Sequence, residues 1–480
     1  MIKEDVLNKQ LPSWLSSAIF HMIVIIILAL WILPGRFNNA ITLSTSTSSE
    51  YLEMLDEMNL PTPVVTSDWE ASEKITNVVG SIDNNLNPSD LGPDFNDMVP
   101  GKIGNNIFPS SVGDLITNSG GRGGKGGGGP LGGRGDGYNK RKGTPEGDAV
   151  ALALRWLAAH QFPDGGWSFD HTMSPLCQNQ CRDRDIGNKN ARIGATGMAL
   201  LPFLGAGQTH MKGDYQKTVR GGLYFLISNM KLDATGGSLR DEGGNMYSHG
   251  IASIVLCEAF AMSNDKALRI PAQQSINFIC YAQDPVGGGW RYQPRERGDT
   301  SVVGWQIMAL KSGHMAYLII PPETVQRVSA YFDAVQYESG SRYGYTDPNG
   351  GSKATTAIGL LCRMYLGWSK DHPALERGAE WLANTGPSKG DMYYNYYATQ
   401  VMRHHGGDNW EKWDEVMKPQ LVNSQAKEGH ETGSWITDDP HGKKAGGRLY
   451  CTSMAAMVLE VYYRHLPLYK TQSVEEEFPE

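Results

Sequence analysis

Basic charge is scarce in this chain, whose 480 residues include 43 lysines and arginines against 51 aspartates and glutamates. The net charge of −8 and the pI near 5.9 argue against a general nucleic-acid binder, because such proteins are usually basic. A Gly-X-Y period is missing, so the 57 glycines do not form a collagen-like helix. Cysteine is limited to six residues. The chain does contain 40% hydrophobic residues, which is enough for a large core and excludes disorder throughout.

Glycine and charge are unevenly distributed and divide the chain into segments. Residues 119–143 hold 13 glycines and a net charge of +5, whereas residues 40–118 carry −10 and are rich in Ser, Thr, Asn and Pro. Ordering glycine is entropically costly, so residues 119–143 are predicted to be a flexible linker. The predicted order is a cytoplasmic tail (1–13), a transmembrane helix (14–34), an acidic stalk (35–118), a Gly-rich basic linker (119–143), a folded domain (144–470) and an acidic tail (471–480).

The predicted transmembrane helix rests on an uncharged run from Trp14 to Leu33. Twenty residues at 1.5 Å each span the hydrocarbon layer of about 30 Å. A cleaved signal peptide is the alternative, with a shorter apolar region and small residues at its cleavage site. Lys3 and Lys9 precede the run and acidic residues follow it, so the N-terminus is predicted to be cytoplasmic and the folded domain extracytoplasmic, on an inner membrane.

Ser17 and His21 lie inside this run at a spacing that puts them on one helix face. Ionisable residues within a membrane are costly and are candidates for function, although a neutral histidine bonded to Ser17 is the alternative. The segment Ser17-Ala18-Ile19-Phe20-His21 resembles the Ser-x-x-x-His signature of TonB and TolA anchor helices. That resemblance implies coupling to a proton-driven complex of the ExbB/ExbD or TolQ/TolR type.

From residue 144 onward the sequence repeats itself. The unit is an aromatic-apolar pair, then a glutamine, then a glycine and an aromatic residue, and it is clearest at residues 156–167 and 278–290. A looser copy at residues 331–345 closes on Gly344-Tyr345, and degenerate copies occupy 225–239, 381–394 and 421–435. Six units of about 50 residues indicate a repeat architecture.

Each unit predicts a pair of helices joined by a glycine-rich turn. Before the turn comes a helix with large apolar residues, as at 150–160 and 272–281, and after it a helix rich in small residues. Small residues permit the close packing that an inner ring requires, so the chain is predicted to be all-α, an (α/α)6 toroid. The predicted inner helices are 195–204, 251–261, 300–310, 355–366, 398–404 and 452–462.

These units resemble the QW repeats of squalene and terpene cyclases, whose toroid also occurs in protein prenyltransferase β subunits and complement-like thioester domains. The segments 298–306 and 462–469 resemble membrane-anchored prenyltransferase/squalene oxidase repeat proteins of planctomycete bacteria. The resemblance covers residues 144–470 and implies the toroid fold.

The catalytic motifs of these families are absent or broken. Terpene cyclases of class II use the central acid of Asp-x-Asp-Asp, and the corresponding position in the nearest phrase is Gly298. Asp299 is predicted to cap its helix instead. Prenyltransferases hold zinc with Asp-x-Cys and His; here Cys451 replaces the histidine and the other half is missing, so Cys451 is a weak metal candidate. The thioester motif is not matched, and no cofactor is predicted.

The remaining candidates lie at the mouth of the predicted barrel, at inner-helix N-termini and the turns before them. Six helix N-termini at one rim favour an anionic or polar ligand, and acids with histidine can perform general acid–base chemistry. The alternative is that these residues cap helices and solvate the rim. The predicted rim residues are Arg192, His249, Arg291, Lys353, Tyr396 and Tyr450, with Asp241 and Glu242 nearby, and the weak catalytic candidates are Asp299, His430 and Glu431.

Cysteine pattern is informative at one place, where Cys177 and Cys181 lie in a polar insertion of the first repeat. Outside the cytoplasm such a pair often forms a disulfide, which is the prediction here. A metal site with His171 is the less favoured alternative. The other four cysteines fall in apolar helical stretches and are predicted to be packing residues.

The sequence therefore predicts a membrane-anchored extracytoplasmic toroid. Its predicted role is non-catalytic binding of a hydrophobic, polyprenyl or glycan ligand or of a protein partner, with possible coupling to a TonB/Tol-like motor. The alternative is an enzyme that acts on a terpenoid or polysaccharide in the barrel cavity.

Overall fold

The structure of the chain is a computed structural model, which describes residues 131, 133–181, 190–241, 244–437, 442 and 446–465. The predicted transmembrane helix with Ser17 and His21, the stalk and the acidic tail lie outside the described residues, as does Glu242. Among the described residues no helix is both long and apolar enough to cross a membrane.

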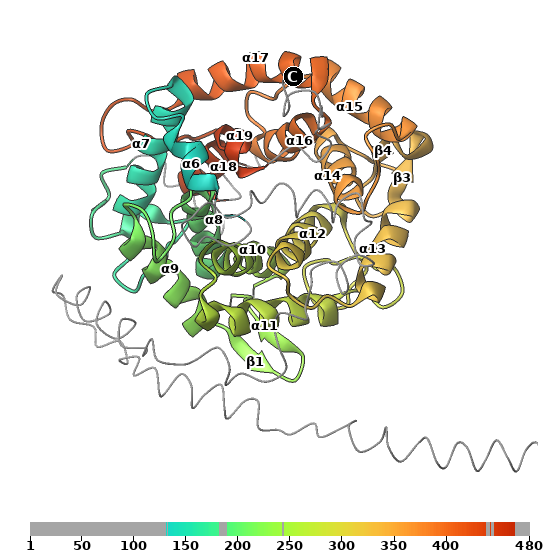
Figure 1. Cartoon of the computed structure of the whole chain (residues 1–480), viewed down its shortest axis with the longest axis horizontal. Helices are drawn as coiled ribbons and strands as arrows, with labels where there is room; N and C mark the ends of the chain where they lie inside the picture. Colours follow the sequence, from blue (N-terminus) through green and yellow to red (C-terminus); the bar gives the residue numbers. More distant parts are fainter. Residues whose placement is uncertain are drawn as a thin grey trace, which may run out of the picture. The chain divides into compact units, whose positions relative to one another are not determined.

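Two concentric rings of helices make up the described fold (Figure 1). Each inner helix packs against the next, and α18 packs against α8, so the inner ring closes on itself. This confirms the predicted α/α toroid. The inner helices are α8 (Arg192–Gly205), α10 (Met246–Ser263), α12 (Thr300–Met315), α14 (Lys353–Tyr365), α16 (Met392–His405) and α18 (Gly447–Leu459); the outer helices are α7 (Pro145–Ala159), α9 (Gln216–Ser228), α11 (Lys266–Ala282), α13 (Pro322–Val335), α15 (Pro373–Thr385) and α17 (Gly407–Ser424).

Short elements complete the described fold. Two antiparallel hairpins lie between helices, β1 (Lys231–Asp233) with β2 (Gly236–Ser238) and β3 (Gln336–Tyr337) with β4 (Arg342–Tyr343). The 3-10 turns are η3 (His171–Met173) and η4 (Glu338–Gly340), and two short helices, α6 (Arg134–Asn139) and α19 (Val461–Arg464), flank the rings in sequence.

The two rings differ in which faces they bury. Inner helices such as α10 and α12 are buried on almost every side, whereas outer helices such as α13 and α15 bury one face. Small residues allow the inner helices to approach closely: a Cβ on Gly197 of α8 would lie 2.9 Å from Cγ2 of Ile251 on α10. The small-residue pattern therefore marks the inner ring, as predicted.

The glutamine of the repeat joins one repeat to the next. In the first, third and sixth repeats its side-chain amide donates two hydrogen bonds, one to a glycine carbonyl in its own turn and one to a carbonyl in the first turns of the following outer helix. A buried amide that satisfies two backbone carbonyls fixes the spacing of neighbouring repeats. The acceptors are Gly165 and Thr218 for Gln161, Gly288 and Thr324 for Gln283, and Gly433 and Ala149 for Gln425, at 2.8–2.9 Å.

The tryptophan of the repeat anchors the turn to its own outer helix. Trp167, Trp290 and Trp435 are almost completely buried, and each indole N–H donates to a carbonyl near the end of the preceding outer helix at 2.8–2.9 Å. The backbone N–H groups of Trp167 and Trp435 also donate to threonine hydroxyls on the inner helices. The QW pattern is thus a set of hydrogen bonds that orient turn, outer helix and inner helix together.

The structure shifts the predicted closing position of two repeats. In the fourth, Tyr343 is fully buried and its N–H contacts the Thr356 hydroxyl as the tryptophans contact theirs, while Tyr345 is half-buried at the surface. The prediction that Tyr345 closes this repeat is therefore wrong, and Tyr343, two residues earlier, occupies the position. In the fifth, Tyr394 lies inside α16, which begins at Met392 rather than near Ala398. Burial, not the Gly-Tyr dipeptide, decides which aromatic residue fills the position.

The seam between the sixth and first repeats closes the ring. Gln425, after α17, donates to the carbonyl of Ala149 in α7. Gly433 has a φ of +93°, and a Cβ there would lie 2.4 Å from the carbonyl oxygen of Leu152 in α7. The ring is closed by the same contacts that join its interior repeats.

Part of the predicted linker is ordered against the ring. Residues 134–139, expected within a flexible segment, form α6, and Arg134 and Tyr138 are buried. The Tyr138 ring packs edge-on against Tyr463 of α19 at 6.1 Å. Gly207, with a φ of +76°, allows the approach, because a Cβ there would lie 2.2 Å from the backbone nitrogen of Gly135. The folded domain therefore includes α6, and the expected boundary at residue 144 is too late.

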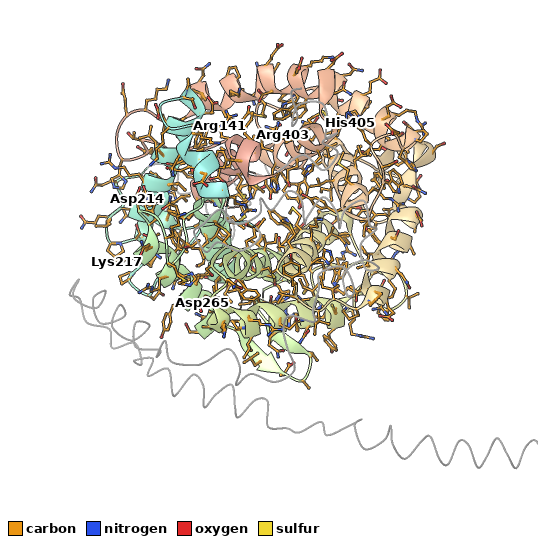
Figure 2. All side chains as sticks on the ribbon, in the orientation of Figure 1. Arg141, Asp214, Lys217, Asp265, Arg403 and His405 are labelled. Atoms are coloured by element: carbon orange, nitrogen blue, oxygen red, sulfur yellow. The ribbon has the colours of Figure 1, made fainter. Side chains whose placement is uncertain are left out.

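Three cationic side chains surround the aromatic side chain of Tyr462 in α19. Arg141, labelled in Figure 2, lies 4.0 Å from the centroid of the Tyr462 ring, and Arg403, labelled in the same view, lies 5.8 Å from it. Lys418 of α17 also contacts this ring, at 4.9 Å. Cation–π contacts of this kind attach the segment that follows α6 to the outer surface of the ring.

Candidate functional site

Aromatic side chains of α12 and α16 meet inside the ring. Trp305 of α12 stacks on Tyr396 of α16, with centroids 5.7 Å apart and planes 15° apart, and meets Tyr397 edge-on at 5.9 Å. In the inner ring α14 lies between these two helices (Figure 1), so the contact joins helices that are not adjacent. Burial raises the pKa of Tyr396 to about 12, so it is neutral there. Tyr396, expected at the rim, is an interior residue.

A group of tyrosines lies at the end of the ring where the inner helices begin, which we call the mouth. Tyr247 and Ser301 share a hydrogen bond of 2.6 Å between their hydroxyls, and the Tyr393 hydroxyl donates to the Ser301 carbonyl at 3.0 Å. The hydroxyls of Tyr292 and Tyr345 are 3.0 Å apart. Tyr292 is 39% exposed, so its aromatic ring is available to a ligand at this end.

Asp299 is fully buried at the mouth and caps α12. One carboxylate oxygen accepts hydrogen bonds from the Val302 backbone N–H at 2.9 Å and the Ser301 hydroxyl at 2.6 Å. Arg291 Nε lies 3.8 Å from the other oxygen. The predicted capping role is confirmed, and the catalytic role stays a prediction.

His249, predicted at the rim, is instead a core residue. It is fully buried, and its Nδ1 accepts a hydrogen bond from the Leu239 backbone N–H at 3.0 Å. Its Nε2–H therefore donates to the Ser275 carbonyl at 3.1 Å. Burial lowers the pKa of His249 to about 3, so the ring is neutral. The histidine joins a turn to two helices and does not face a ligand.

Arg192 and Lys353 begin two inner helices and both contact protein groups. Arg192 forms a bidentate ion pair with Asp164 and lies 4.8 Å from the centroid of the Phe225 ring. Lys353 Nζ lies 4.6 Å from the Tyr394 ring centroid. Both are partly exposed; the charge of Arg192 is compensated by Asp164, whereas Lys353 adds positive charge at the mouth.

The remaining candidates belong to the last repeat. Tyr450 is 9% exposed on α18, and Cys451 is fully buried with its sulfur 3.5 Å from the Thr437 hydroxyl. Cys451 is not part of the one group of potential metal ligands found among the described residues. The backbone carbonyl of Glu431 accepts the Ser434 hydroxyl, and Glu431 itself is half-buried.

The opposite end of the interior contains a buried ion network. Arg134 of α6 forms a bidentate pair with Glu258 of α10 at 2.8 and 3.1 Å, and Arg464 of α19 contacts the same carboxylate at 2.9 Å. Burial acts to raise the pKa of Glu258, but the two arginines outweigh it and the pKa is lowered. Burial raises the pKa of Glu460 well above its usual value, against the opposing effect of Arg464, which lies 3.6 Å from this second acid. α6 is thus attached to the ring by compensated charges.

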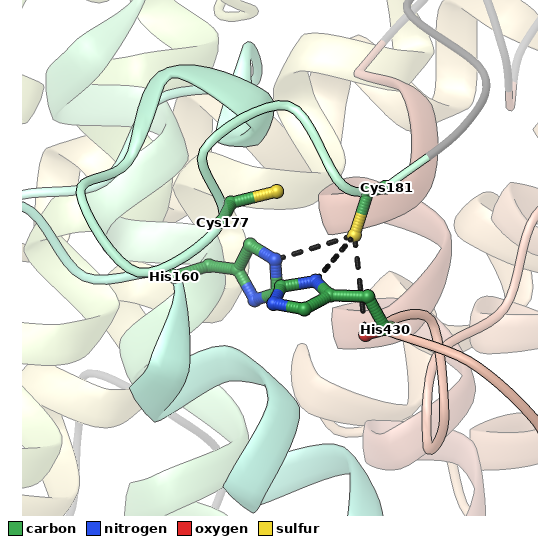
Figure 3. Close-up of side chains that lie close together, drawn as sticks. All are labelled: His160, Cys177, Cys181 and His430. Carbon is green, nitrogen blue, oxygen red and sulfur yellow. Dashed lines mark hydrogen bonds between the residues drawn. The ribbon is translucent and has the colours of Figure 1, made fainter.

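A cluster of two histidines and two cysteines lies at the seam between the first and last repeats (Figure 3). His160 ends α7, Cys177 and Cys181 lie between α7 and α8, and His430 lies between α17 and α18. One potential ligand atom from each residue lies within 4.8 Å of the others. Cys181 Sγ is 3.4 Å from His160 Nε2 and 3.2 Å from His430 Nδ1. Both cysteines are free thiols here, and the disulfide stays a prediction.

Surrounding groups fix the orientation of His160. Its Nδ1 lies 2.7 Å from the Trp156 carbonyl, so this nitrogen carries the proton and the Nε2 lone pair faces Cys181. The Trp156 ring stacks on the imidazole with centroids 4.0 Å apart. Burial lowers the pKa of His160 to about 3 and raises the pKa of the Cys181 thiol to about 12.

Sequence reasoning missed His160 and did not connect His430 with the cysteines. One signal was present: the residue before the repeat glutamine is His160 in the first repeat, where the other units have Ala282, Val335 and Ser424. His171, the ligand considered with the cysteines, lies beside the cluster with its ring 5.3 Å from that of His160, but it is not one of the four.

Comparisons with known proteins return structures but no sequence relatives. No protein-family model matches the chain, and no curated protein matches it. An inactive variant of the GH76A α-1,6-mannanase of Salegentibacter sp. HEL1_6, in complex with α-1,6-mannotriose, is 8% identical with a TM-score of 0.48, covering 66% of this chain and 99% of that one. The type II terpene cyclase MstE from Scytonema, with geranylgeranyl dihydroxybenzoate, is 12% identical with a TM-score of 0.46, covering 67% and 97%. At these identities the likeness concerns the fold and not the chemistry.

Proposed function

We propose that the ring is a binding module that holds a glycan at its mouth and performs no reaction there. The observation that supports this is the group of mouth tyrosines around Ser301, which offers an exposed aromatic ring beside several hydroxyls. Aromatic side chains with polar tips suit ligands that have both apolar faces and polar edges, as sugars do. Lys353 adds positive charge at the same end, which favours an acidic sugar.

Two features favour binding over catalysis. Asp299, the acid at the mouth, accepts hydrogen bonds from its own helix and so acts as a cap. Inside the ring, Trp305 and Tyr396 stack on each other, so these aromatic faces are occupied by protein side chains.

The second candidate is an enzyme of terpenoid or polysaccharide type. The fully buried carboxylate of Asp299 at the mouth favours it, because carboxylates positioned at a substrate site can transfer protons. Turnover that depends on Asp299, His430 or Glu431 would support this candidate. Unchanged turnover in all three single variants would eliminate these sites.

Calorimetric titration of the purified full chain tests the binding proposal. We would use chitotetraose as a neutral glycan, tetragalacturonate as an acidic glycan and farnesyl phosphate as a polyprenyl probe. We expect tetragalacturonate to bind, and Tyr292→Ala to raise its Kd at least about tenfold, which is about 1.4 kcal/mol. Tyr317→Ala is the matched control, since Tyr317 is 57% exposed just after α12 and away from the mouth. Binding of farnesyl phosphate alone, or of none of the three, would overturn the glycan proposal.

We also propose that residues 14–34 anchor the ring to the inner membrane with the ring outside the cytoplasm, and that Ser17 and His21 couple it to a complex of the ExbB/ExbD or TolQ/TolR type. The uncharged run and the Ser-x-x-x-His spacing support this. Ser17→Ala and His21→Ala are expected to abolish cellular function while leaving the amount of membrane-bound protein unchanged. Wild-type behaviour of both variants in cells would refute the motor coupling.

A further inference from the structure

We propose that His160, Cys177, Cys181 and His430 bind a structural zinc ion that fastens the first repeat to the last. This inference is independent of the glycan site, because none of the four residues belongs to the group of mouth tyrosines. A closed ring needs a junction between its first and last repeats, and the zinc ion would bind residues of both at this junction.

The donor atoms already have the spacing that zinc requires. Tetrahedral Zn²⁺ with Zn–S of about 2.3 Å and Zn–N of about 2.0 Å places a sulfur and a nitrogen ligand about 3.5 Å apart. Cys181 Sγ lies 3.4 Å from His160 Nε2 and 3.2 Å from His430 Nδ1, and all four donors lie within 4.8 Å of one another. Figure 3 shows both imidazoles directed at the Cys181 sulfur. Four donors within 4.8 Å of one another can close around one ion by small shifts of their side chains.

The surroundings are those of a metal-binding histidine. A metal-ligating imidazole usually donates its other N–H to a carbonyl or carboxylate, which fixes the ring and the tautomer. His160 does this through Nδ1 to the Trp156 carbonyl at 2.7 Å, and the Trp156 ring covers one face of the imidazole. The free nitrogen is therefore held towards the two thiols before any metal arrives.

The ligand set and its burial indicate a structural rather than a catalytic ion. Two thiolates and two imidazoles fill all four positions of tetrahedral zinc, so no position remains for water or substrate. His160, Cys177 and Cys181 are at most 2% exposed, which shields the site from solvent. Soft sulfur ligands with imidazole favour zinc over magnesium or calcium.

A disulfide between Cys177 and Cys181 is the competing arrangement. It would use both sulfurs within one short loop and would give no reason for two histidines from opposite ends of the described chain to converge on them. A zinc ion uses all four groups. It also connects the end of α7 with the α17–α18 connection, beside the contact of Gln425 with Ala149, so one ion would hold together repeats that are farthest apart in sequence.

Metal analysis of the purified full chain tests the proposal. We expect about one zinc per chain, and at least a tenfold loss of bound zinc in Cys181→Ser and in His430→Asn. Cys280→Ser is the matched control, since Cys280 is a partly buried free thiol of α11 remote from the cluster, and it should keep its zinc. His430→Cys should also keep zinc, because three cysteines and one histidine form a tetrahedral zinc site as well. This variant separates ligand chemistry from a general folding defect.

A second readout follows the seam itself. Removal of zinc with a chelator should speed amide hydrogen exchange at residues 145–157 and 421–435 several-fold. The equivalent contact between the third and fourth repeats, made by Gln283, should be unaffected and serves as an internal control. Copper or iron in place of zinc, less than a tenth of an ion per chain, or a Cys177–Cys181 disulfide in peptides of the unreduced protein would overturn the proposal.

Discussion

Replacement of Gln425 by methionine tests whether the ring is energetically closed. The Gln425 amide donates to the carbonyls of Ala149 and Gly433 at 2.8 and 2.9 Å, and the side chain is 7% exposed. Methionine has a similar length, so packing volume is retained while both carbonyls lose the Gln425 donor. The Ala149 carbonyl keeps its hydrogen bond within α7, whereas the Gly433 carbonyl is left without a donor. A buried polar group left without its partner costs about 1–3 kcal/mol, so the free energy of unfolding should fall by about that amount.

Urea denaturation followed by tryptophan fluorescence measures this loss. Gln283→Met removes the equivalent pair of hydrogen bonds inside the ring and should cost a similar amount. Gln326→Met, at an exposed position of α13, should stay within about 0.5 kcal/mol of wild type. If the contact between the sixth and first repeats contributed nothing to stability, the loss of the Gln425 hydrogen bonds would not change the free energy of unfolding. A change below about 0.5 kcal/mol for Gln425→Met beside a large loss for Gln283→Met would therefore refute the closed-ring reasoning.

Three further perturbations have defined outcomes. Gly207→Ala should release α6, because the new Cβ would clash with the backbone of Gly135, and the rate of limited proteolysis in the α6 segment should rise several-fold. Gly386→Ala is the control: its φ is similarly positive but no atom lies within 4 Å, so the proteolysis rate should be unchanged. The pKa of His249 falls from 6.5 to about 3 on folding, so the unfolded chain binds more protons between these values; stability should be full above pH 6.5 and decline as the pH falls towards 3, and His249→Gln should flatten this dependence in urea titrations at pH 7, 6 and 5. Trp305→Ala should cost about 3–5 kcal/mol in the same assay, and a loss under about 1 kcal/mol would show that the rings across the interior are loosely packed.

The ring could be predicted from the sequence because each repeat carries its own local signal. Glutamine, glycine and an aromatic residue recur in the same order, and in the first, third and sixth repeats the glutamine amide makes equivalent hydrogen bonds, as Gln161 and Gln283 do. Where the pattern weakens, the prediction also weakens: Gly344-Tyr345 matched the motif by letter, but the buried residue is Tyr343.

The cluster at the seam could not be predicted in the same way. His430 and Cys181 are 249 residues apart, and nothing local to either indicates that the ring brings them within 3.2 Å. α6 was missed for another reason. Its glycine content is typical of a flexible linker, but Arg134 and Tyr138 find partners on α10 and α19, and tertiary contacts override the local preference. The mouth was predicted in part. The sequence indicated where the inner helices begin, but it did not indicate which residues near those positions, such as His249, are buried in the core.

The contact between α6 and α19 has a topological consequence. Gly137 and Tyr463 approach so closely that a Cβ on the glycine would lie 2.4 Å from the tyrosine Cβ. The first and last described helices therefore meet at one point on a ring whose inner helices pack each on the next and whose last inner helix packs on the first. A circular permutant that links residue 465 to residue 134 through a short peptide, with new termini between α12 and α13, should fold to the same structure. The order of the repeats along the chain is then a matter of where the ring is cut, and not of how it is held together.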